Sequence, residues 1–174
     1  FGPEDQFFNR FAAMTRMAPA LPVVGAATRF QPVYVDDVAQ AAVKGILGQA
    51  KPGIYELGGP EVASFRALMQ RMLGVIRRRR LIVNVPFAVA AIMGTVLDLL
   101  QTVTLGLFHN SLLTRDQVRN LRRDNVVTEG RMGFAELGIT PTAMDAVLED
   151  YLWQYRPGGQ YAEIKEAARH LRQE

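Results

Sequence analysis

Apolar side chains recur three and four positions apart in three segments, which is the spacing of one face of an α-helix. The first segment follows Glu4 and Asp5, two acids that favour a helix N-terminus. The second follows Ser64, a residue type preferred at the N-cap, and the third follows Thr140 and Pro141. The pattern predicts three amphipathic helices with these apolar faces: Phe7, Phe8, Phe11 and Met14; Phe65, Leu68, Met69, Met72, Leu73 and Ile76; and Met144, Val147, Leu148, Tyr151, Leu152 and Tyr155.

Shorter signals fill the intervals between these helices. Residues 21–25, 30–35, 53–57 and 81–85 predict short β-strands. The order Thr-Arg-Asp-Gln at 114–117 predicts the start of a helix, and Gly138 predicts the end of a short one. Asp36 and Asp37 predict the N-cap of a further helix that begins near Val38, with an apolar face made of Val38, Ala41, Ala42 and Ile46. The whole pattern indicates an α/β protein that is mainly helical with a few short strands.

Residues 86–108 are strongly apolar and, at about 20 residues, long enough to span a bilayer. Three interpretations stand, in order of preference: one or two buried helices, an exposed apolar face that meets a membrane or a large partner, and a transmembrane helix. Asp98 counts against the last, because a central carboxylate costs roughly 2.5–3.5 kcal/mol on insertion. The second gains from the arginines just upstream, since each basic residue contributes about 1 kcal/mol near an anionic surface.

Composition bounds the chain to one globular domain with a core of its own, since 49% of its 174 residues are hydrophobic and 21% are charged. Cysteine is absent, which excludes disulfides and thiolate chemistry. His109 and His170 are too few and too far apart to predict a metal site. Residues 1–5 lack the features of a signal peptide. We expect the chain to begin inside a domain. We expect a cytoplasmic protein, which could also attach peripherally to the inner face of the cell membrane.

Basic residues are unevenly distributed although the net charge is only +3. Such clusters attract anionic partners, and a solvated face is the default alternative. No module of stacking aromatic residues accompanies them, so we do not expect nucleic-acid binding. One cluster consists of Arg77, Arg78, Arg79 and Arg80, and the other of Arg115, Arg119, Arg122 and Arg123. We expect the cluster at 77–80 to be the membrane or partner surface.

Two motifs resemble a known family. The sequence reads Arg-Phe-Gln-Pro-Val-Tyr-Val-Asp-Asp-Val-Ala at 29–39 and Gly-Ile-Tyr-Glu-Leu-Gly-Gly-Pro-Glu at 53–61. In this order and spacing they resemble the C-terminal half of an extended short-chain dehydrogenase/reductase. Residues 112–118, 124–126, 137–141 and 151–159 narrow the resemblance to an atypical branch of that family. The branch contains the dehydrogenase-like accessory subunit of respiratory complex I and its bacterial relatives.

The resemblance implies a partial Rossmann-type fold. Residues 1–160 correspond to the substrate-side lobe, and residues 161–174 are expected to form an amphipathic C-terminal helix or tail. The family binds NADP or NAD on a glycine-rich loop after its first strand, and Gly25-Ala-Ala lacks that spacing. We therefore expect the dinucleotide-binding half to lie before Phe1, and no dinucleotide to bind this chain tightly. A remnant of the cofactor site is expected at Phe1, Gly2 and Pro3.

The resemblance also implies a substrate pocket, for which we expect Arg29, Gln31 and Tyr34 to supply the lining. We interpret Asp36 and Asp37 as helix caps rather than catalytic acids. Tyr161 and Lys165 have the spacing of the family's proton-transfer pair, but they lie in the tail, far downstream of the family's position. We take that match as a coincidence and expect no catalytic residue.

Three functions remain open from the sequence. The preferred one is a structural or assembly subunit associated with respiratory complex I (NADH:quinone oxidoreductase). The second is an active NAD(P)-dependent reductase, epimerase or dehydratase, and the third is a membrane-surface interaction module. The expected partners are the chain's own N-terminal Rossmann half, complex I subunits, an anionic membrane surface, and a second copy where apolar surface is left uncovered.

Overall fold

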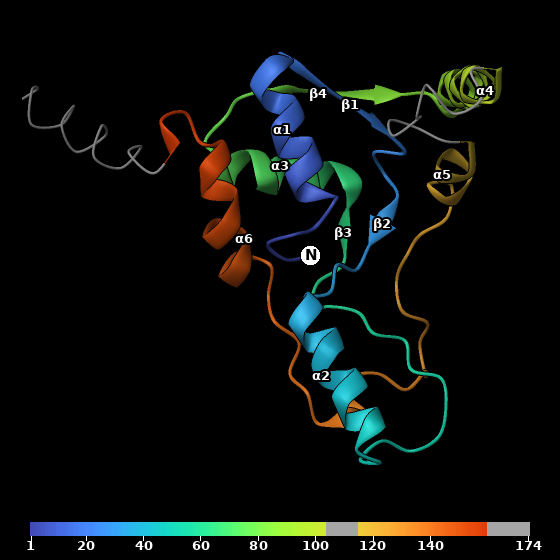
Figure 1. The fold of residues 1–174 in the computed structure, drawn as a ribbon, viewed down its shortest axis with the longest axis vertical. Helices are drawn as coiled ribbons and strands as arrows, with labels where there is room; N and C mark the ends of the chain where they lie inside the picture. Colours follow the sequence, from blue (N-terminus) through green and yellow to red (C-terminus); the bar gives the residue numbers. More distant parts are fainter. Residues whose placement is uncertain (104–114, 160–174) are drawn as a thin grey trace, which may run out of the picture.

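The computed structural model describes residues 1–103 and 115–159, and the elements fall into a larger lobe and a smaller one (Figure 1). The larger lobe contains α1 (Phe8–Met17), β1 (Ala20–Val24), α3 (Phe65–Val75), β4 (Leu81–Val85) and α6 (Asp145–Leu152). The smaller lobe is built around α2 (Val35–Ile46), beside which residues 49–60 and 125–141 run. Short 3-10 turns at Ala135–Leu137 and Trp153–Tyr155 complete the described elements.

The core of the larger lobe is formed by the three predicted helical stripes. Helix α1 packs against β1, α3 and α6, and α3 also contacts α6. Strands β1 and β4 pair in parallel, from Ala20 opposite Leu81 to Val24 opposite Val85. The predicted apolar faces are thereby confirmed, as are strands 81–85 and, shifted by one residue, 21–25. The buried centre comprises Phe8, Ala12, Leu21, Val23, Phe65, Leu68, Met69, Met72, Ile76, Met144, Leu148 and Leu152.

Helix α3 begins as the sequence predicts. The Ser64 hydroxyl accepts a hydrogen bond from the Ala67 N–H at 3.2 Å, which caps the first turn. Ser64 also ends β3 (Ala63–Ser64), which pairs antiparallel with β2 (Arg29–Phe30). Phe65, the next residue, packs its ring against Phe7, Phe11 and Phe30 at centroid distances of 5.3 to 5.6 Å. This aromatic cluster fixes the β2–β3 pair on the core.

Helix α2 differs from its prediction in both its start and its orientation. It begins at Val35 with Tyr34 at the N-cap position, and no side chain caps it. Asp36 and Asp37 lie in its first turn, so the prediction that they cap a helix near Val38 is wrong. Its predicted apolar face is only partly inward, because Ala41 is buried while Ile46 is 84% exposed. Ala42 is exposed as well.

Two predicted strands are much shorter in the structure. Of residues 30–35 only Phe30 lies in a strand, β2 (Arg29–Phe30), and Val35 already belongs to α2. Residues 53–57 form a single bridge, Tyr55 opposite Met132, since no longer strand runs beside them among the described residues. Gly138 adopts the left-handed conformation (φ +61°) that ends the turn before it, as predicted. Helix α6 starts later than Thr140–Pro141 indicated, at Asp145.

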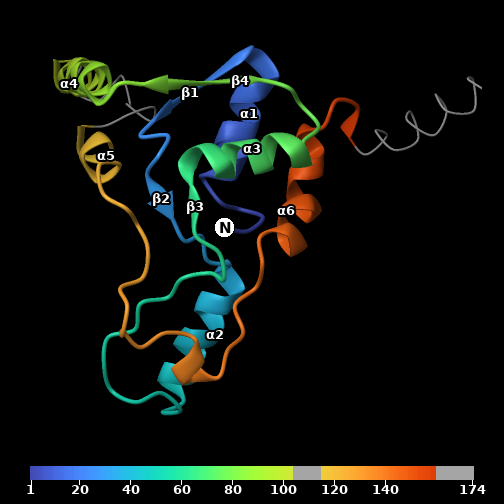
Figure 2. The same cartoon turned by 180° about the vertical axis from the view of Figure 1, so that it is seen from behind.

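Helices α4 (Phe87–Val103) and α5 (Arg115–Asn120) stand together at one end of the larger lobe in both views (Figures 1 and 2). Val24, Ala90 and Val118 form a small buried cluster that joins them to β1. Within the described residues, no helix has the length and apolar character needed to cross a membrane. Helix α4 is not a fully buried helix either, because Ile92 is 66% exposed. Several predicted features lie outside the described residues: His109, Thr114 and the expected C-terminal helix at 161–174, which includes Tyr161, Lys165 and His170.

Candidate functional site

Arg29 is tied to Asp124 rather than free to meet a substrate. Its guanidinium Nε lies 2.8 Å from the Asp124 carboxylate, and its backbone N–H donates to the same carboxylate at 2.8 Å. The Asn125 N–H in turn donates to the Arg29 carbonyl at 2.8 Å. These backbone N–H and side-chain hydrogen bonds hold the pKa of Asp124 below its ordinary value, and the positive charge of Arg29 adds to the effect. Arg29 thus anchors the segment that follows α5 to the edge of β2.

Gln31 makes the next link along the same segment. Its amide nitrogen donates to the Gly59 carbonyl at 2.8 Å, and its amide oxygen accepts from the Val127 N–H at 3.1 Å. A side chain at Gly58 would collide with this amide, since an added Cβ would lie 2.6 Å from the Cδ atom of the Gln31 side chain. Gln31 therefore joins residues 58–59 to residue 127, which form one wall of an adjoining cavity.

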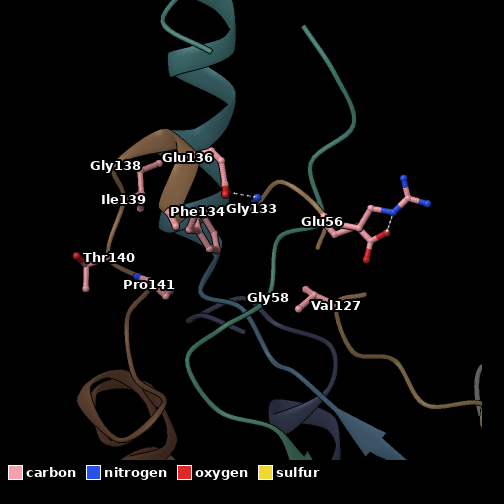
Figure 3. A pocket seen from close by; sticks show the side chains of 12 residues that line it. Glu56, Gly58, Val127, Gly133, Phe134, Glu136, Gly138, Ile139, Thr140 and Pro141 are labelled. Carbon is pink, nitrogen blue, oxygen red and sulfur yellow. Dashed lines mark hydrogen bonds and ion pairs between the residues drawn. The ribbon is translucent and has the colours of Figure 1, made fainter. Parts of the chain in front are cut away.

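The cavity is an open groove of about 650 Å³ in the smaller lobe. Figure 3 shows Ile139, Thr140 and Pro141 on one side, facing Glu56, Gly58 and Val127 across the gap. Its floor is apolar, while carboxylates lie at the rim. The complete lining is Glu56, Gly58, Val127, Arg131, Gly133, Phe134, Ala135, Glu136, Gly138, Ile139, Thr140 and Pro141.

The rim carboxylates are held in their ionised form by the backbone. Glu56 accepts the Thr128 N–H at 2.7 Å and lies 3.6 Å from the Arg131 guanidinium, and these contacts lower its pKa. Glu136 accepts the Gly133 N–H at 2.6 Å, which lowers its pKa too. A carboxyl group with a lowered pKa is a poor proton donor or acceptor near neutral pH. Both carboxylates therefore hold the walls of the groove to each other through backbone N–H groups.

Tyr34 does not line this groove. It lies at the start of α2, where its ring packs 5.6 Å from the Phe1 ring. Its hydroxyl is hydrogen-bonded to Asp36, which raises the pKa of Tyr34. The three residues expected to form one substrate pocket are thus divided: Gln31 contacts the groove wall, Arg29 is bound to Asp124, and Tyr34 lies beside the chain's first residues.

Phe1, Gly2 and Pro3 line a second cavity of about 440 Å³, together with Glu4, Asp5 and Val35. A dinucleotide pyrophosphate needs N–H donors or cationic side chains, whereas the side chains of this lining are acidic or apolar. Gly2 is needed by the fold, because an added Cβ would lie 2.8 Å from a Val35 methyl carbon. The remnant of a cofactor site expected at Phe1, Gly2 and Pro3 stays a prediction. Gly25 turns β1 toward β2 and not into a helix.

Asp5, beside this cavity, has a structural role. Its carboxylate accepts the Phe8 N–H at 2.6 Å at the start of α1, and it accepts the Tyr151 hydroxyl from α6. Burial, followed by this bond to Asp5, raises the pKa of Tyr151. Within the parts of the chain that the structure describes, no three potential metal ligands gather.

The cluster Arg77–80 does not present four equivalent charges. The Arg78 guanidinium donates to the Tyr155 carbonyl at 2.8 Å, and the Arg80 guanidinium donates to the Thr15 carbonyl at 2.9 Å. Both side chains are half-buried, while Arg77 and Arg79 are exposed. Arg78 and Arg80 therefore connect the turn before β4 to the 3-10 turn Trp153–Tyr155 and to α1. The cluster sits at the start of β4, and α4 follows the other end of that strand.

The groove itself was missed by reasoning from the sequence. The sequences Asp-Asn-Val at 124–126 and Leu-Gly-Ile-Thr-Pro at 137–141 served there only to narrow a resemblance. The second forms one wall of the groove, and the first is bound by Arg29 and Gln31 just before Val127. A hint was available in Gly58 and Gly133, since glycines far apart in sequence often mark close backbone approach.

Comparison with known proteins shows that this chain is similar in sequence to respiratory subunits. The chain is 33% identical over 162 residues to NADH dehydrogenase (ubiquinone) 1 alpha subcomplex subunit 9, mitochondrial, of Arabidopsis thaliana. The match covers 91% of the chain. The relatives are NADH dehydrogenase subunits. The protein of the same name from Dictyostelium discoideum is 24% identical over 160 residues. The expected relation to complex I is thereby supported by sequence similarity. No protein-family model matches the chain.

The alignments span only part of these relatives. They cover 40% of the Arabidopsis protein and 43% of the Dictyostelium protein, against 91% of this chain in both cases. The similarity therefore reaches the core, the groove and α4 alike, but concerns less than half of each relative.

Proposed function

We propose that the chain is the C-terminal portion of a dinucleotide-binding, reductase-like subunit and serves NADH:quinone oxidoreductase as a structural or assembly element. The observation that carries this proposal is the 33% identity, over 91% of the chain, to a protein named as an NADH dehydrogenase subunit. The groove supports a non-catalytic role, because the side chains of Glu56, Glu136 and Gln31 form hydrogen bonds with backbone groups of the groove walls. The parent protein would bind NADP or NAD elsewhere.

Helix α2 supports the presence of a partner in this smaller lobe, because its apolar residues face outward. On its inner side, Asp37 accepts the Thr142 N–H at 2.6 Å, and the Lys44 ammonium donates to the Leu137 carbonyl. On the outer side of the helix, five apolar residues are exposed, and we call them the outer α2 face: Val35, Ala39, Ala42, Val43 and Ile46. A helix that turns its larger apolar side chains away from its own lobe is suited to packing against another element.

The extended segment at 53–57 supports the same partner. The Glu56 N–H donates to the Met132 carbonyl at 2.9 Å, and this is the one bridged position of the segment. Tyr55 and Leu57 pack on the same small core as Ala41 of α2. In a Rossmann fold, helices cover the faces of a parallel sheet. Residues 53–57 could therefore lie along the edge of such a sheet, and the outer α2 face could cover one of its sides. We propose that the dinucleotide-binding half of the subunit packs here and holds the cofactor.

The proposal is tested by purification from native membranes. A tagged copy of the chain, with the dinucleotide-binding half that accompanies it in the cell, is isolated from membranes solubilised in mild detergent. We expect NADH:quinone oxidoreductase subunits to co-purify. The variant Val43→Gln/Ile46→Gln should lose them, because two amides would be placed in an apolar contact. Recovery of the wild-type chain free of every subunit of that enzyme would contradict the proposal.

A further inference from the structure

Three arginines gather where the end of α1 meets the turn between α3 and β4, apart from the groove and from α2. In both views this turn lies between the end of α6 and the C-terminal end of α1 (Figures 1 and 2). The Arg80 guanidinium donates through Nε to the Thr15 carbonyl at 2.9 Å, in the turn of α1 that carries Arg16. Arg78 donates through Nε to the Tyr155 carbonyl at 2.8 Å, in the 3-10 turn that contacts α1. We call Arg16, Arg78 and Arg80 the arginine cluster.

The turn that carries Arg78 and Arg80 has a defined shape. The Arg77 N–H donates to the Gly74 carbonyl at 3.1 Å. The Arg78 N–H donates to the Leu73 carbonyl at 3.1 Å, which completes a Schellman motif at the end of α3. Arg77 takes the left-handed conformation (φ +51°) that glycine usually supplies at this position. The turn and the two carbonyl bonds thus fix where the guanidinium groups of Arg78 and Arg80 lie.

The carbonyl bonds leave outer nitrogen atoms of the cluster available. Arg78 uses only Nε, so neither of its Nη atoms has a partner among the described residues. Arg80 uses Nε and one Nη atom, which donates to the Arg79 carbonyl at 3.0 Å. Arg16 is exposed and forms no ion pair within the part of the chain that the structure describes. Guanidinium N–H groups that remain available in this way are donors for an oxyanion.

The positive charge of the cluster is not offset by carboxylates in the described chain. The segments that meet here contain no aspartate or glutamate: residues 6–35, 62–97 and 151–159. Glu149, just before the last of them, is paired with Arg156 at 3.2 Å. Burial lowers the pKa of Arg78, and the positive charges of Arg80 and Arg16 lower it further. The three cations therefore repel one another, and an anion bound among them would relieve that repulsion.

We propose that the arginine cluster binds a phosphate group, either free phosphate or a phosphomonoester. Such a dianion offers three acceptor oxygens, which guanidinium groups bind through paired N–H donors. Arginines near helix ends commonly cap carbonyls. Capping explains the bond from Arg80 to α1, but it leaves Arg16 and the Nη atoms of Arg78 without a role. This site goes beyond the proposed place in NADH:quinone oxidoreductase and needs no dinucleotide-binding partner.

The experiment is isothermal titration of the full chain with inorganic phosphate at constant ionic strength. Phosphate is added to about 10 mM, ten times a Kd of about 1 mM, and we expect one saturable site. Arg16→Gln should weaken binding about 10-fold, from the loss of one charge-assisted contact. Arg119→Gln is the matched control, because it also removes an exposed arginine from the last turn of a helix. It should leave the affinity within about twofold of the wild type.

A second pair of variants tests the geometry without removing charge. Arg78→Lys keeps the cation but loses the planar fork that holds a carbonyl and a phosphate together, so binding should weaken about 10-fold. Arg79→Lys, at the exposed neighbouring position, should leave binding within about twofold of the wild type. Circular dichroism checks that all four variants keep their helices. Equal weakening in Arg79→Lys would overturn the assignment to the arginine cluster.

Two further arms distinguish the source of the phosphate group. Glycerol 3-phosphate carries the group in soluble form, and vesicles of phosphatidylcholine with phosphatidic acid carry it on a lipid. Binding of glycerol 3-phosphate without vesicle flotation would assign the site to a soluble phosphomonoester. Flotation that inorganic phosphate competes away and Arg16→Gln weakens would assign it to a lipid headgroup. No saturable binding of inorganic phosphate, or binding that Arg16→Gln and Arg78→Lys leave unchanged, would overturn the proposal.

Discussion

At the scale of single residues, charged and polar side chains in this protein mainly hold backbone segments together. Asp37 shows this most clearly, because it is only 2% exposed and both its oxygens accept from Thr142, at 2.6 Å and 3.0 Å. It looked like a helix cap in the sequence, since an aspartate before an apolar helical pattern usually is one. Its actual partner lies 105 residues away, a distance that no local rule can anticipate.

The role of Asp37 predicts a large loss of stability on truncation. Asp37→Ala leaves the half-buried Thr142 N–H and hydroxyl without their acceptor, so we expect the free energy of unfolding to fall by about 2 kcal/mol. Asp36→Ala, one position earlier and exposed, is the control and should cost less than about 1 kcal/mol. Urea unfolding of both variants measures the difference. Equal losses would show that the bond to Thr142 contributes little.

The rim and anchor carboxylates predict a dependence of stability on pH. Hydrogen bonds from backbone N–H groups lower the folded pKa of Asp124, Glu56 and Glu136 below their ordinary values of 3.8, 4.5 and 4.5. A lowered folded pKa means that the stabilisation is present above the ordinary pKa and is lost as pH falls through the folded one. We therefore expect the melting temperature to drop below about pH 5.

Asp124→Asn separates this effect from general acid unfolding. The variant should lose melting temperature at pH 7, and its loss between pH 7 and pH 3 should be smaller than that of the wild type. Asp150→Asn, an exposed change on α6, should reproduce the wild-type profile. If both variants followed the wild-type curve, the bonds between Arg29 and Asp124 would not contribute to acid sensitivity.

At the scale of elements, sequence patterns predicted what packs locally and missed what depends on distant partners. The α3 stripe from Phe65 to Ile76, its Ser64 cap and the turn at Gly138 all follow from spacing and residue type. The strand expected at 53–57 needs a neighbouring strand, and the described chain offers only Met132 at one position. The orientation of α2 was equally out of reach, because both of its sides carry alanine and valine and only the contacts of Asp37 and Lys44 decide which one faces inward.

Helix α3 predicts a sharp contrast between two leucines. Leu68 is 1% exposed in the core, whereas Leu81 at the start of β4 is 74% exposed. Leu68→Ala should lower the free energy of unfolding by about 2–5 kcal/mol, from lost burial and the cavity left behind. Leu81→Ala should change it by less than about 0.5 kcal/mol. Chemical denaturation of both is the measurement. A comparable cost at position 81 would mean that β4 is covered in solution.

At the scale of the whole molecule, one core supports two outward apolar faces at different places. The outer α2 face belongs to the smaller lobe, and the exposed apolar side of α4 (Val89, Ile92, Met93 and Val96) stands at one end of the larger lobe (Figure 2). Large exposed apolar patches mark interaction sites in folded proteins. The fold thus presents two separate apolar surfaces that its own described residues do not cover.

The same view predicts that the chain alone binds no dinucleotide tightly. The lining of the cavity at Phe1, Gly2 and Pro3 offers the carboxylates of Glu4 and Asp5 where a pyrophosphate would need donors. Titration calorimetry of the chain with NADH and with NADPH should show no submicromolar binding. Submicromolar binding of either dinucleotide to the monomer would contradict this description of the cavity.

The central claim is that the outer α2 face meets a dinucleotide-binding half within NADH:quinone oxidoreductase, and site-specific photo-crosslinking tests it most directly. A photoreactive residue replaces Ile46, which is 84% exposed on α2, and the tagged protein is irradiated in native membranes. Mass spectrometry should identify crosslinks from position 46 to a Rossmann-type segment within the subunits of that enzyme. A photoreactive residue at the exposed position 129 should give few of them. Crosslinks from position 46 only to a second copy of the chain, or only to proteins outside NADH:quinone oxidoreductase, would contradict the claim.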